Sequence, residues 1–336
     1  MKRAWRLCLI LSLLLATILT FYALHLIKQP YQGYDEGIVV HIIPGSSSQE
    51  IVDLLFEHGV LAHRHLSLGY LYVSSHFGLL QAGEYEFAEA LNLKEVFAKL
   101  SGGEIRLHRF TVPEGLILLE IADLWEKEEF GSAKEFIDAA AAALPLVREI
   151  DDAAISIEGY LFPETYSFRR GVTAEEAVAA MVQGFQEALI RLEAEIGMND
   201  WLFGLRDTLT MASLIEREAA VADERPIISS VFHNRLRRAM LLECDPTVIY
   251  ALQLNGSYRG RLLLVDLDVP SPYNTYKYPG LPPGPIANPG LDSLRAAVAP
   301  AETEFLFFVR TDHGRHKFSK TLKEHNRAVA AYRRSR

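Results

Sequence analysis

One carboxylate lies on the apolar face of the helix that the sequence predicts over Leu209–Ala220. At 3.6 residues per turn, Ile215 and Glu218 share one stripe, whereas Glu216 points to the opposite side and is expected to serve structure. Apolar neighbours disfavour a charged carboxyl, so the pKa of Glu218 should rise toward the value that suits a general acid near neutral pH. The alternative is that the helix ends there and Glu218 reaches solvent or an arginine.

Other kinds of reaction chemistry find little support in the sequence. The histidines and the two cysteines form neither an HExxH nor a paired CxxC pattern, so no metal site is expected. There is no Walker loop and no GxGxxG after a predicted strand, so no nucleotide cofactor is expected either. Composition leaves a Ser/His/Asp triad open, but no GxSxG elbow supports it.

Two loop-like stretches, Glu158–Phe168 and Ser271–Gly290, mix aromatic rings with polar side chains. Flat apolar faces beside hydrogen-bonding groups suit a carbohydrate groove, and the prolines of the second stretch would stiffen one wall. Each aromatic taken alone fits a core position better. We expect these stretches and the region after Glu218 to bind substrate through Tyr160, Phe162, Tyr166, Arg225, Asn234, Arg235, Tyr273, Asn274, Thr275, Tyr276 and Asn288. Surface salt bridges are an equally good interpretation of the two arginines.

The composition describes a folded, acidic protein. A chain of 336 residues with 49% hydrophobic residues can bury a large core and suggests two or three structural units. The formal net charge of -9 argues against nucleic acid as a partner.

The first thirty residues predict a membrane anchor. Leu7–Ile27 holds no Asp, Glu, Lys or Arg and is long enough to cross the hydrocarbon core as a helix. Basic residues precede it and Asp35 and Glu36 follow it, so the N-terminus is expected in the cytoplasm and the rest outside. A cleaved signal peptide is the alternative. Cys8 lies in the span, so Cys244 has no disulfide partner in the exported part.

The pattern of elements predicts an α+β fold. Strands are expected at 38–43, 83–87, 107–112 and 304–310, with capped helices between them and a terminal helix over 322–334. Asn92 and Glu95 form a capping-box pattern for one helix, Pro226 is expected at the start of another, and Asp245 is expected to cap a short helix that begins at Pro246. We expect a cytoplasmic tip and transmembrane helix over residues 1–30, a small α/β module over 31–110, and a mixed α+β catalytic domain over 111–336.

Five segments in order resemble the MltG/YceG family of endolytic murein transglycosylases. The first two are TVPEGLILLEIADL and EGYLFPETYSF, the third runs from ASLIEREAAVADERP to DPTVIYAL, the fourth contains GLPPGPIANPG and the fifth is GRHKFSKTLKEHN; the likeness runs from about residue 38 to 330. The resemblance implies that the small module is LysM-like and that the second glutamate of the ExE motif, Glu218, is the catalytic acid. From the same motifs we add to the substrate-binding set Glu158, Glu164, Asp245, Thr247, Tyr250 and Pro283. The chain departs from the family pattern at Glu164, Ala219 and Ala251.

The resemblance implies cleavage within peptidoglycan glycan strands, beside cell-wall synthases at the cytoplasmic membrane, without metal or cofactor. Glu218 would protonate the MurNAc–GlcNAc glycosidic oxygen and then deprotonate the muramyl 6-hydroxyl, leaving a 1,6-anhydro end that terminates the strand. Two alternatives stay open. One is a lysozyme-like hydrolase with Glu158, Glu164 or Asp245 as second carboxylate. The other is a peptidoglycan-binding scaffold that does not cleave.

Overall fold

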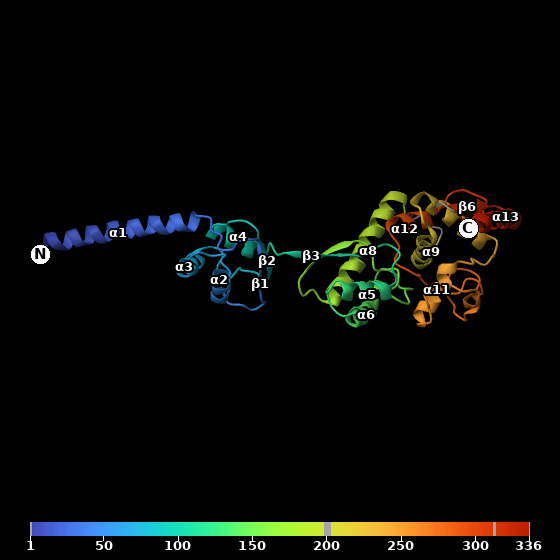
Figure 1. Cartoon of the computed structure of the whole chain (residues 1–336), viewed down its shortest axis with the longest axis horizontal. Helices are drawn as coiled ribbons and strands as arrows, with labels where there is room; N and C mark the ends of the chain where they lie inside the picture. Colours follow the sequence, from blue (N-terminus) through green and yellow to red (C-terminus); the bar gives the residue numbers. More distant parts are fainter. Residues whose placement is uncertain (1, 198–202, 312–313, 336) are drawn as a thin grey trace. The chain divides into compact units, whose positions relative to one another are not determined.

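The computed structural model describes residues 2–197, 203–311 and 314–335 (Figure 1). The chain divides into two compact units, the first of Met1–His108 with Ser167–Gly171 and the second of Arg109–Tyr166 with Val172–Arg336. Helices predominate, and the strands of the described residues form three two-stranded sheets, β1–β2, β3–β4 and β5–β6. The predicted α+β class is confirmed.

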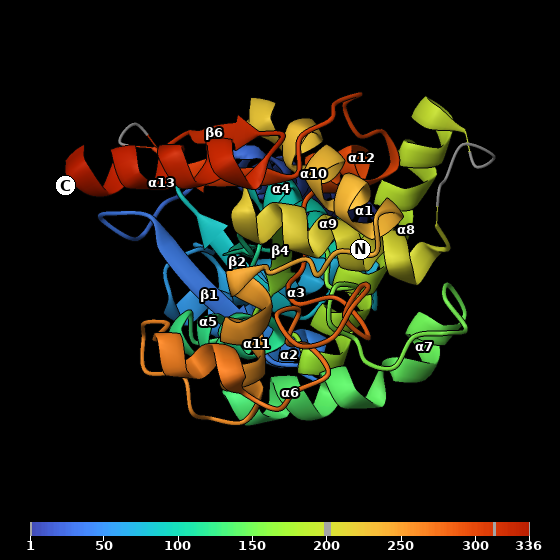
Figure 2. The same ribbon diagram turned by 90° about the vertical axis from the view of Figure 1, so that its right-hand side faces the viewer.

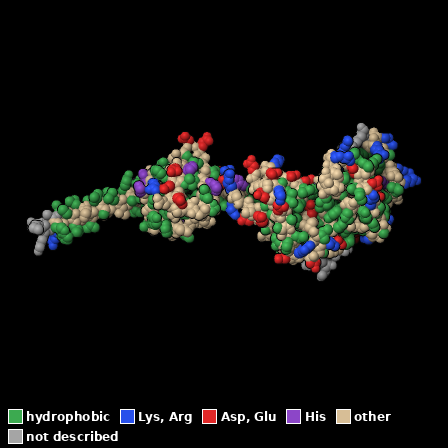
Figure 3. All heavy atoms as spheres, turned by 90° about the horizontal axis from the view of Figure 1, so that it is seen from below, with side chains coloured by type: hydrophobic (Ala, Val, Ile, Leu, Met, Phe, Trp, Pro, Cys, Tyr) green, Lys and Arg blue, Asp and Glu red, His purple; other side chains and the backbone are tan. Residues whose placement is uncertain are grey.

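The N-terminal helix α1 spans Lys2–Lys28. Its segment Trp5–Lys28 is long and apolar enough to cross a membrane, and none of that segment's most apolar window is buried against the protein. Hydrophobic side chains cover the helix in Figure 3. Only near its end does it join the first unit, where Ile27 packs against the core.

The first unit sets three helices beside an antiparallel pair of strands. The strands β1 (Ile38–Ile42) and β2 (Gly83–Phe87) pair with Val40 opposite Tyr85. The helices are α2 (Ser48–Glu57), α3 (Arg64–Val73) and α4 (Leu93–Gly102). Reciprocal capping boxes begin α2 and α4, the second being the predicted Asn92–Glu95 pair, and left-handed Gly103 (φ 67°) ends α4.

The second unit begins with a helical layer around an aromatic cluster. It contains α5 (Leu118–Lys127), α6 (Ala133–Ala142), α7 (Leu144–Arg148) and α8 (Ala174–Ile196). The residues of the strands β3 (Leu107–Thr111) and β4 (Thr165–Arg169) are divided between the two units. The fully buried Trp125 of α5 contacts the rings of Phe110, Phe130 and Phe136. This cluster fixes α5 and α6 against each other.

The rest of the second unit surrounds α9 (Leu205–Glu218). It contains α10 (Arg225–Arg237), α11 (Asp245–Leu254), α12 (Leu291–Val298), β5 (Phe307–Arg310), β6 (His316–Ser319) and α13 (Leu322–Ser335), with short 3-10 turns at Ala222–Glu224 and Leu264–Asp268. Helix α9 contacts α10, α11 and α12, and Figure 2 shows it beside α10 and α12. Every residue of α9 from Thr208 to Ile215 is buried. It is therefore a central helix of the second unit.

Candidate active site

Glu218 is the last residue of α9 and faces a cavity of about 520 Å³. The helix ends there because Ala219 leaves the helical conformation. The side chain is partly exposed, and its exposure is toward the cavity. The cavity is lined by Arg217, Glu218, Ala220, Arg235, Leu242, Glu243, Asp245, Tyr276, Phe308, Val309, Arg310, His316 and His325. The carboxyl thus stands where a buried helix opens onto a space large enough for part of a polymer.

Burial raises the pKa of Glu218 to about 7, and the nearby Asp245 carboxylate adds to the rise. One opposing influence is the Cys244 thiol, which donates to Glu218 Oε1 at 3.3 Å. The expected rise in pKa is confirmed. Part of the alternative is confirmed as well, because α9 ends at Glu218 and the side chain is partly exposed. Among the described residues, no arginine pairs with Glu218. A carboxyl with this pKa is divided between its acid and base forms near neutral pH.

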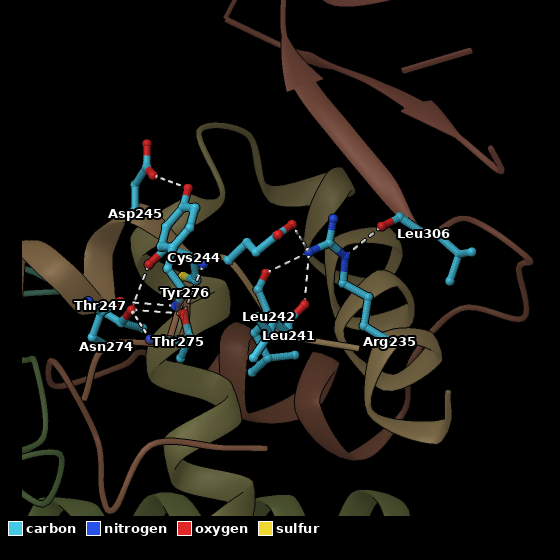
Figure 4. A network of polar contacts seen from close by, with 11 residues as sticks. Arg235, Leu241, Leu242, Cys244, Asp245, Thr247, Asn274, Thr275, Tyr276 and Leu306 are labelled. Atoms are coloured by element: carbon cyan, nitrogen blue, oxygen red, sulfur yellow. Dashed lines mark hydrogen bonds and ion pairs between the residues drawn. The ribbon is translucent and has the colours of Figure 1, made fainter. Parts of the chain in front are cut away.

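Cys244 is itself fixed by two threonines, as Figure 4 shows. Its backbone N–H donates to Thr275 Oγ1 at 3.0 Å, and its carbonyl accepts from Thr247 Oγ1 at 2.7 Å. The two threonine hydroxyls lie 2.9 Å apart. Asn274 anchors the same loop by donating to the carbonyls of Leu267 and Val269. Thr247, Asn274 and Thr275 therefore support the cavity wall from behind.

Unlike these supporting residues, Asp245 and Tyr276 both line the cavity itself. The Tyr276 hydroxyl donates to Asp245 Oδ1 at 2.5 Å. The prediction that Asp245 caps α11 is wrong, since it is the first helical residue and no side chain caps that helix. Its carboxylate is exposed and available to a ligand.

Arg235 lines the cavity with a guanidinium that is already engaged. It donates to the carbonyls of Leu306, Leu241 and Leu242 and pairs with Glu243 at 2.9 Å (Figure 4). Its side chain is only 9% exposed. The interpretation of Arg235 as a surface salt bridge is therefore wrong; it ties α10 to the start of β5.

Two neighbouring predicted residues also hold the scaffold. Asn234 donates to the carbonyls of Thr303 and Phe305, both at 2.9 Å. Arg225 pairs with Glu216 at 3.1 Å, and the second Glu216 oxygen accepts from the Gly290 N–H. Glu216 is nearly buried and serves structure, as predicted, but through these partners rather than through solvent. None of the three lines the cavity.

Glu158 is buried away from the cavity, with only 4% of the residue exposed. Its carboxylate accepts from the Leu118 N–H at 3.0 Å, Asn288 Nδ2 at 2.9 Å and the Tyr250 hydroxyl at 3.3 Å. Burial nevertheless raises its pKa to about 7. Asn288 also accepts from the N–H groups of Gly159 and Leu161, so this cluster joins four segments that are distant in the sequence.

Most of the predicted aromatic groove lies in the core. Tyr160 is 1% exposed, donates to Asp151 and packs edge-on against Phe185, and Tyr166 donates to the Phe162 carbonyl. Tyr273 packs against Tyr250. Glu164 and Pro283 are exposed but do not line the cavity. Of the predicted substrate-binding residues, the structure brings Arg235, Asp245 and Tyr276 to the cavity of Glu218.

Comparison with known proteins identifies the family of this chain. The sequence profile of the YceG-like family matches residues 40–331. The chain belongs to the YceG-like family. This confirms the resemblance seen in its motifs. The chain is 36% identical over 308 residues to the endolytic murein transglycosylase of Bacillus subtilis, across 87% of this chain and 84% of that protein.

Other relatives of this YceG-like chain are longer or known by structure. It is 29% identical over 324 residues to the endolytic murein transglycosylase of Streptococcus pneumoniae, covering 88% of this chain but 58% of that protein. A crystal structure of a YceG-like protein from Listeria monocytogenes matches it with a TM-score of 0.60 and 33% identity. That match covers 88% of this chain and 100% of the Listeria chain.

Sequence reasoning missed the wall that closes the cavity of this YceG-like chain. Phe308 and Arg310 come from β5, and His325 comes from α13. The alternation of Phe308 and Arg310 along a strand was the available signal. Burial and nearby Arg235 lower the pKa of His325, which stacks on Phe307 at 5.3 Å. Among the described residues, no group of three or more His, Cys, Asp or Glu side chains could hold a metal ion.

Proposed function

We propose that this YceG-like chain is an endolytic murein transglycosylase with Glu218 as its catalytic acid and base. The observation that supports this proposal best is that the Glu218 carboxyl, whose pKa is raised, lies at the wall of a cavity. Relatives of the chain are named endolytic murein transglycosylases. The substrate is the glycan strand of peptidoglycan, and no cofactor is required.

The protonated Glu218 donates its proton to the glycosidic oxygen between MurNAc and GlcNAc as the bond from C1 breaks. The resulting carboxylate takes the proton of the muramyl 6-hydroxyl while that oxygen bonds to C1. The product is a 1,6-anhydro-MurNAc end, and Glu218 finishes protonated, as it began. Because the nucleophile belongs to the substrate, one carboxyl performs both proton transfers.

Asp245 is the second carboxylate to consider, since it lines the same cavity and Glu158 and Glu164 do not. In the transglycosylase its negative charge faces the developing positive charge of the sugar, as in glycosidase transition states. In a hydrolase it would activate water. Its bond from Tyr276 holds it in place for either role.

We place the cleavage outside the cytoplasmic membrane, with α1 as the anchor and the N-terminus in the cytoplasm. The basic residues before the apolar span support this orientation. Work beside cell-wall synthases follows, because an anchored enzyme meets strands as they emerge and can end their elongation. The LysM-like assignment of residues 31–110 and the boundaries at 30 and 110 stay predictions.

The test incubates the detergent-solubilised full chain with purified peptidoglycan and determines product masses. We expect internal cleavage to products lighter than hydrolysis products by one water. Products that contain the added water would instead establish the hydrolase. Binding without cleavage, unchanged in Glu218→Gln, would establish the scaffold and overturn the proposal.

A further inference from the structure

The side chain that touches the proposed catalytic carboxyl is a cysteine, which the mechanism above does not use. Cys244 Sγ lies 3.3 Å from Glu218 Oε1, and when Glu218 is charged the thiol is the donor, because a carboxylate only accepts. In the part of the chain that the structure describes, this thiol is the carboxyl's one hydrogen-bond partner. Glu158, by contrast, accepts from three groups.

Hydrogen bonds hold both backbone polar groups of Cys244. The Cys244 N–H and carbonyl are held by Thr275 and Thr247, and the residue is 1% exposed. The two threonines come from α11 and from the proline-rich loop after it. The backbone that carries the thiol is therefore fixed, and from it the buried Sγ contacts Glu218.

We propose that Cys244 is a positioning residue, whose buried thiol holds the Glu218 carboxyl toward the cavity while leaving it free to bind a proton. This rests on the proposed function of Glu218. A thiol is a weak donor, so it orients a carboxylate with little stabilisation of its charge. A hydroxyl in the same place would stabilise the charged form more strongly and make Glu218 a poorer acid near neutral pH.

The thiol stays protonated through this cycle. Burial raises the pKa of Cys244 well above its usual range, and the adjacent Glu218 raises it further. Cys244 thus neither competes for the transferred proton nor acts as a nucleophile. Its contribution passes through Glu218.

Other polar and charged groups line the same cavity as Glu218, and none of them is changed in the Cys244 variants compared below. Arg235 is occupied by its carbonyl and Glu243 partners, and Asp245 raises the pKa of Glu218. The full set comprises Arg217 on α9, Arg235 on α10, Glu243 before α11, Asp245 on α11, Tyr276 on the proline-rich loop, Arg310 on β5, His316 on β6 and His325 on α13. A shift confined to Cys244 variants is therefore assigned to the thiol.

The direct test is infrared spectroscopy of the S–H stretching band, which reports hydrogen bonding without substrate. The full chain in detergent carries Cys8→Ser, so that Cys244 is its one thiol. We expect the band to move with pH at the midpoint of Glu218 and to shift in Glu218→Gln. A band that ignores both changes overturns the proposal, whether or not the protein cleaves peptidoglycan.

The kinetic test compares Cys244→Ser and Cys244→Ala in that background by the pH profile of kcat/KM on peptidoglycan. The wild-type rate should fall as pH rises through about 7, because the acid form of Glu218 is lost. In Cys244→Ser this limb moves down by about one pH unit. In Cys244→Ala the limb stays or moves up, and kcat falls on the order of 10- to 100-fold with KM little changed.

Thermal unfolding of both variants separates positioning from folding. Losses of activity that follow the loss of folded protein, with the pH limb unmoved in both variants, overturn the proposal. If neither variant nor the parent cleaves while the S–H band still responds to Glu218, the proposed function has failed and the contact stands.

Discussion

Glu158 and Glu218 have the same elevated pKa, about 7, in opposite surroundings. Burial is the main cause at both positions. Glu158 is enclosed by Leu118, Tyr250 and Asn288, which together donate to both of its oxygens. Glu218 has one thiol donor and an open side toward a cavity.

The difference shows that a raised pKa does not by itself mark a catalytic acid. A carboxyl whose oxygens are occupied by fixed donors joins segments together and cannot reach a ligand. A carboxyl with a sparse set of donors and an open face can exchange its proton with a substrate. We therefore propose a structural role for Glu158 and a chemical role for Glu218, and the same substitution at each residue tests this proposal.

The largest effect is expected from Glu218→Gln. Removing a positioned general acid lowers the rate about 100- to 10,000-fold. The amide fills the same space and the cavity is open, so the melting temperature should change little. Release of soluble fragments from peptidoglycan measures the rate, with unfolding followed in parallel. Full activity in a folded Glu218→Gln protein would show that Glu218 is not the catalytic acid.

The raised pKa of Glu158 is expected to make the stability of the protein depend on pH. Its pKa rises from 4.5 to about 7 on folding, so its protonation favours the folded state. That contribution is fully present below pH 4.5 and is lost as pH rises through 7, amounting to roughly 3 kcal/mol. Melting temperatures measured between pH 4.5 and 8 should fall less steeply in Glu158→Gln than in wild type. Parallel curves would show that the folded pKa of Glu158 is ordinary.

Glu158→Gln at neutral pH should lower the free energy of unfolding by about 2 kcal/mol. An amide offers one acceptor oxygen where three donors converge, so at least one buried donor loses its partner. The rate per folded molecule should stay near wild type, measured beside Glu218→Gln in the same assay. A rate loss as large as that of Glu218→Gln would place Glu158 in the chemistry.

Local features of the site could be predicted from the sequence. Helical periodicity identified the apolar surroundings of Glu218, because those neighbours lie within one or two turns of the same helix. The cap at Asn92 and the helix start at Pro226 depend on adjacent residues and were also predicted. Such features need no knowledge of the rest of the chain.

Features that depend on distant residues could not be predicted. Arg235 and Asn234 bind backbone carbonyls about seventy positions later, and no side-chain pattern marks a carbonyl as a partner. The aromatic stretch around Tyr160 has the composition of a sugar groove, yet α8 covers it. The cavity itself needs β5 and α13 to return to the end of α9, which is a property of the tertiary fold.

The smallest effect is expected from Glu216→Gln, which controls for the site on the same helix. The amide loses the ion pair with Arg225 but can still accept from the Gly290 N–H, and Arg225 keeps the Glu114 carboxylate as a partner at 3.3 Å. We therefore expect a loss of about 1 kcal/mol in the free energy of unfolding. Activity should be unchanged because Glu216 does not line the cavity. Assayed beside Glu218→Gln, the Glu216→Gln variant tests whether two carboxyls only two residues apart differ in their effect on activity, as their different surroundings lead us to expect. An activity loss without a loss of stability would extend the chemical site to both.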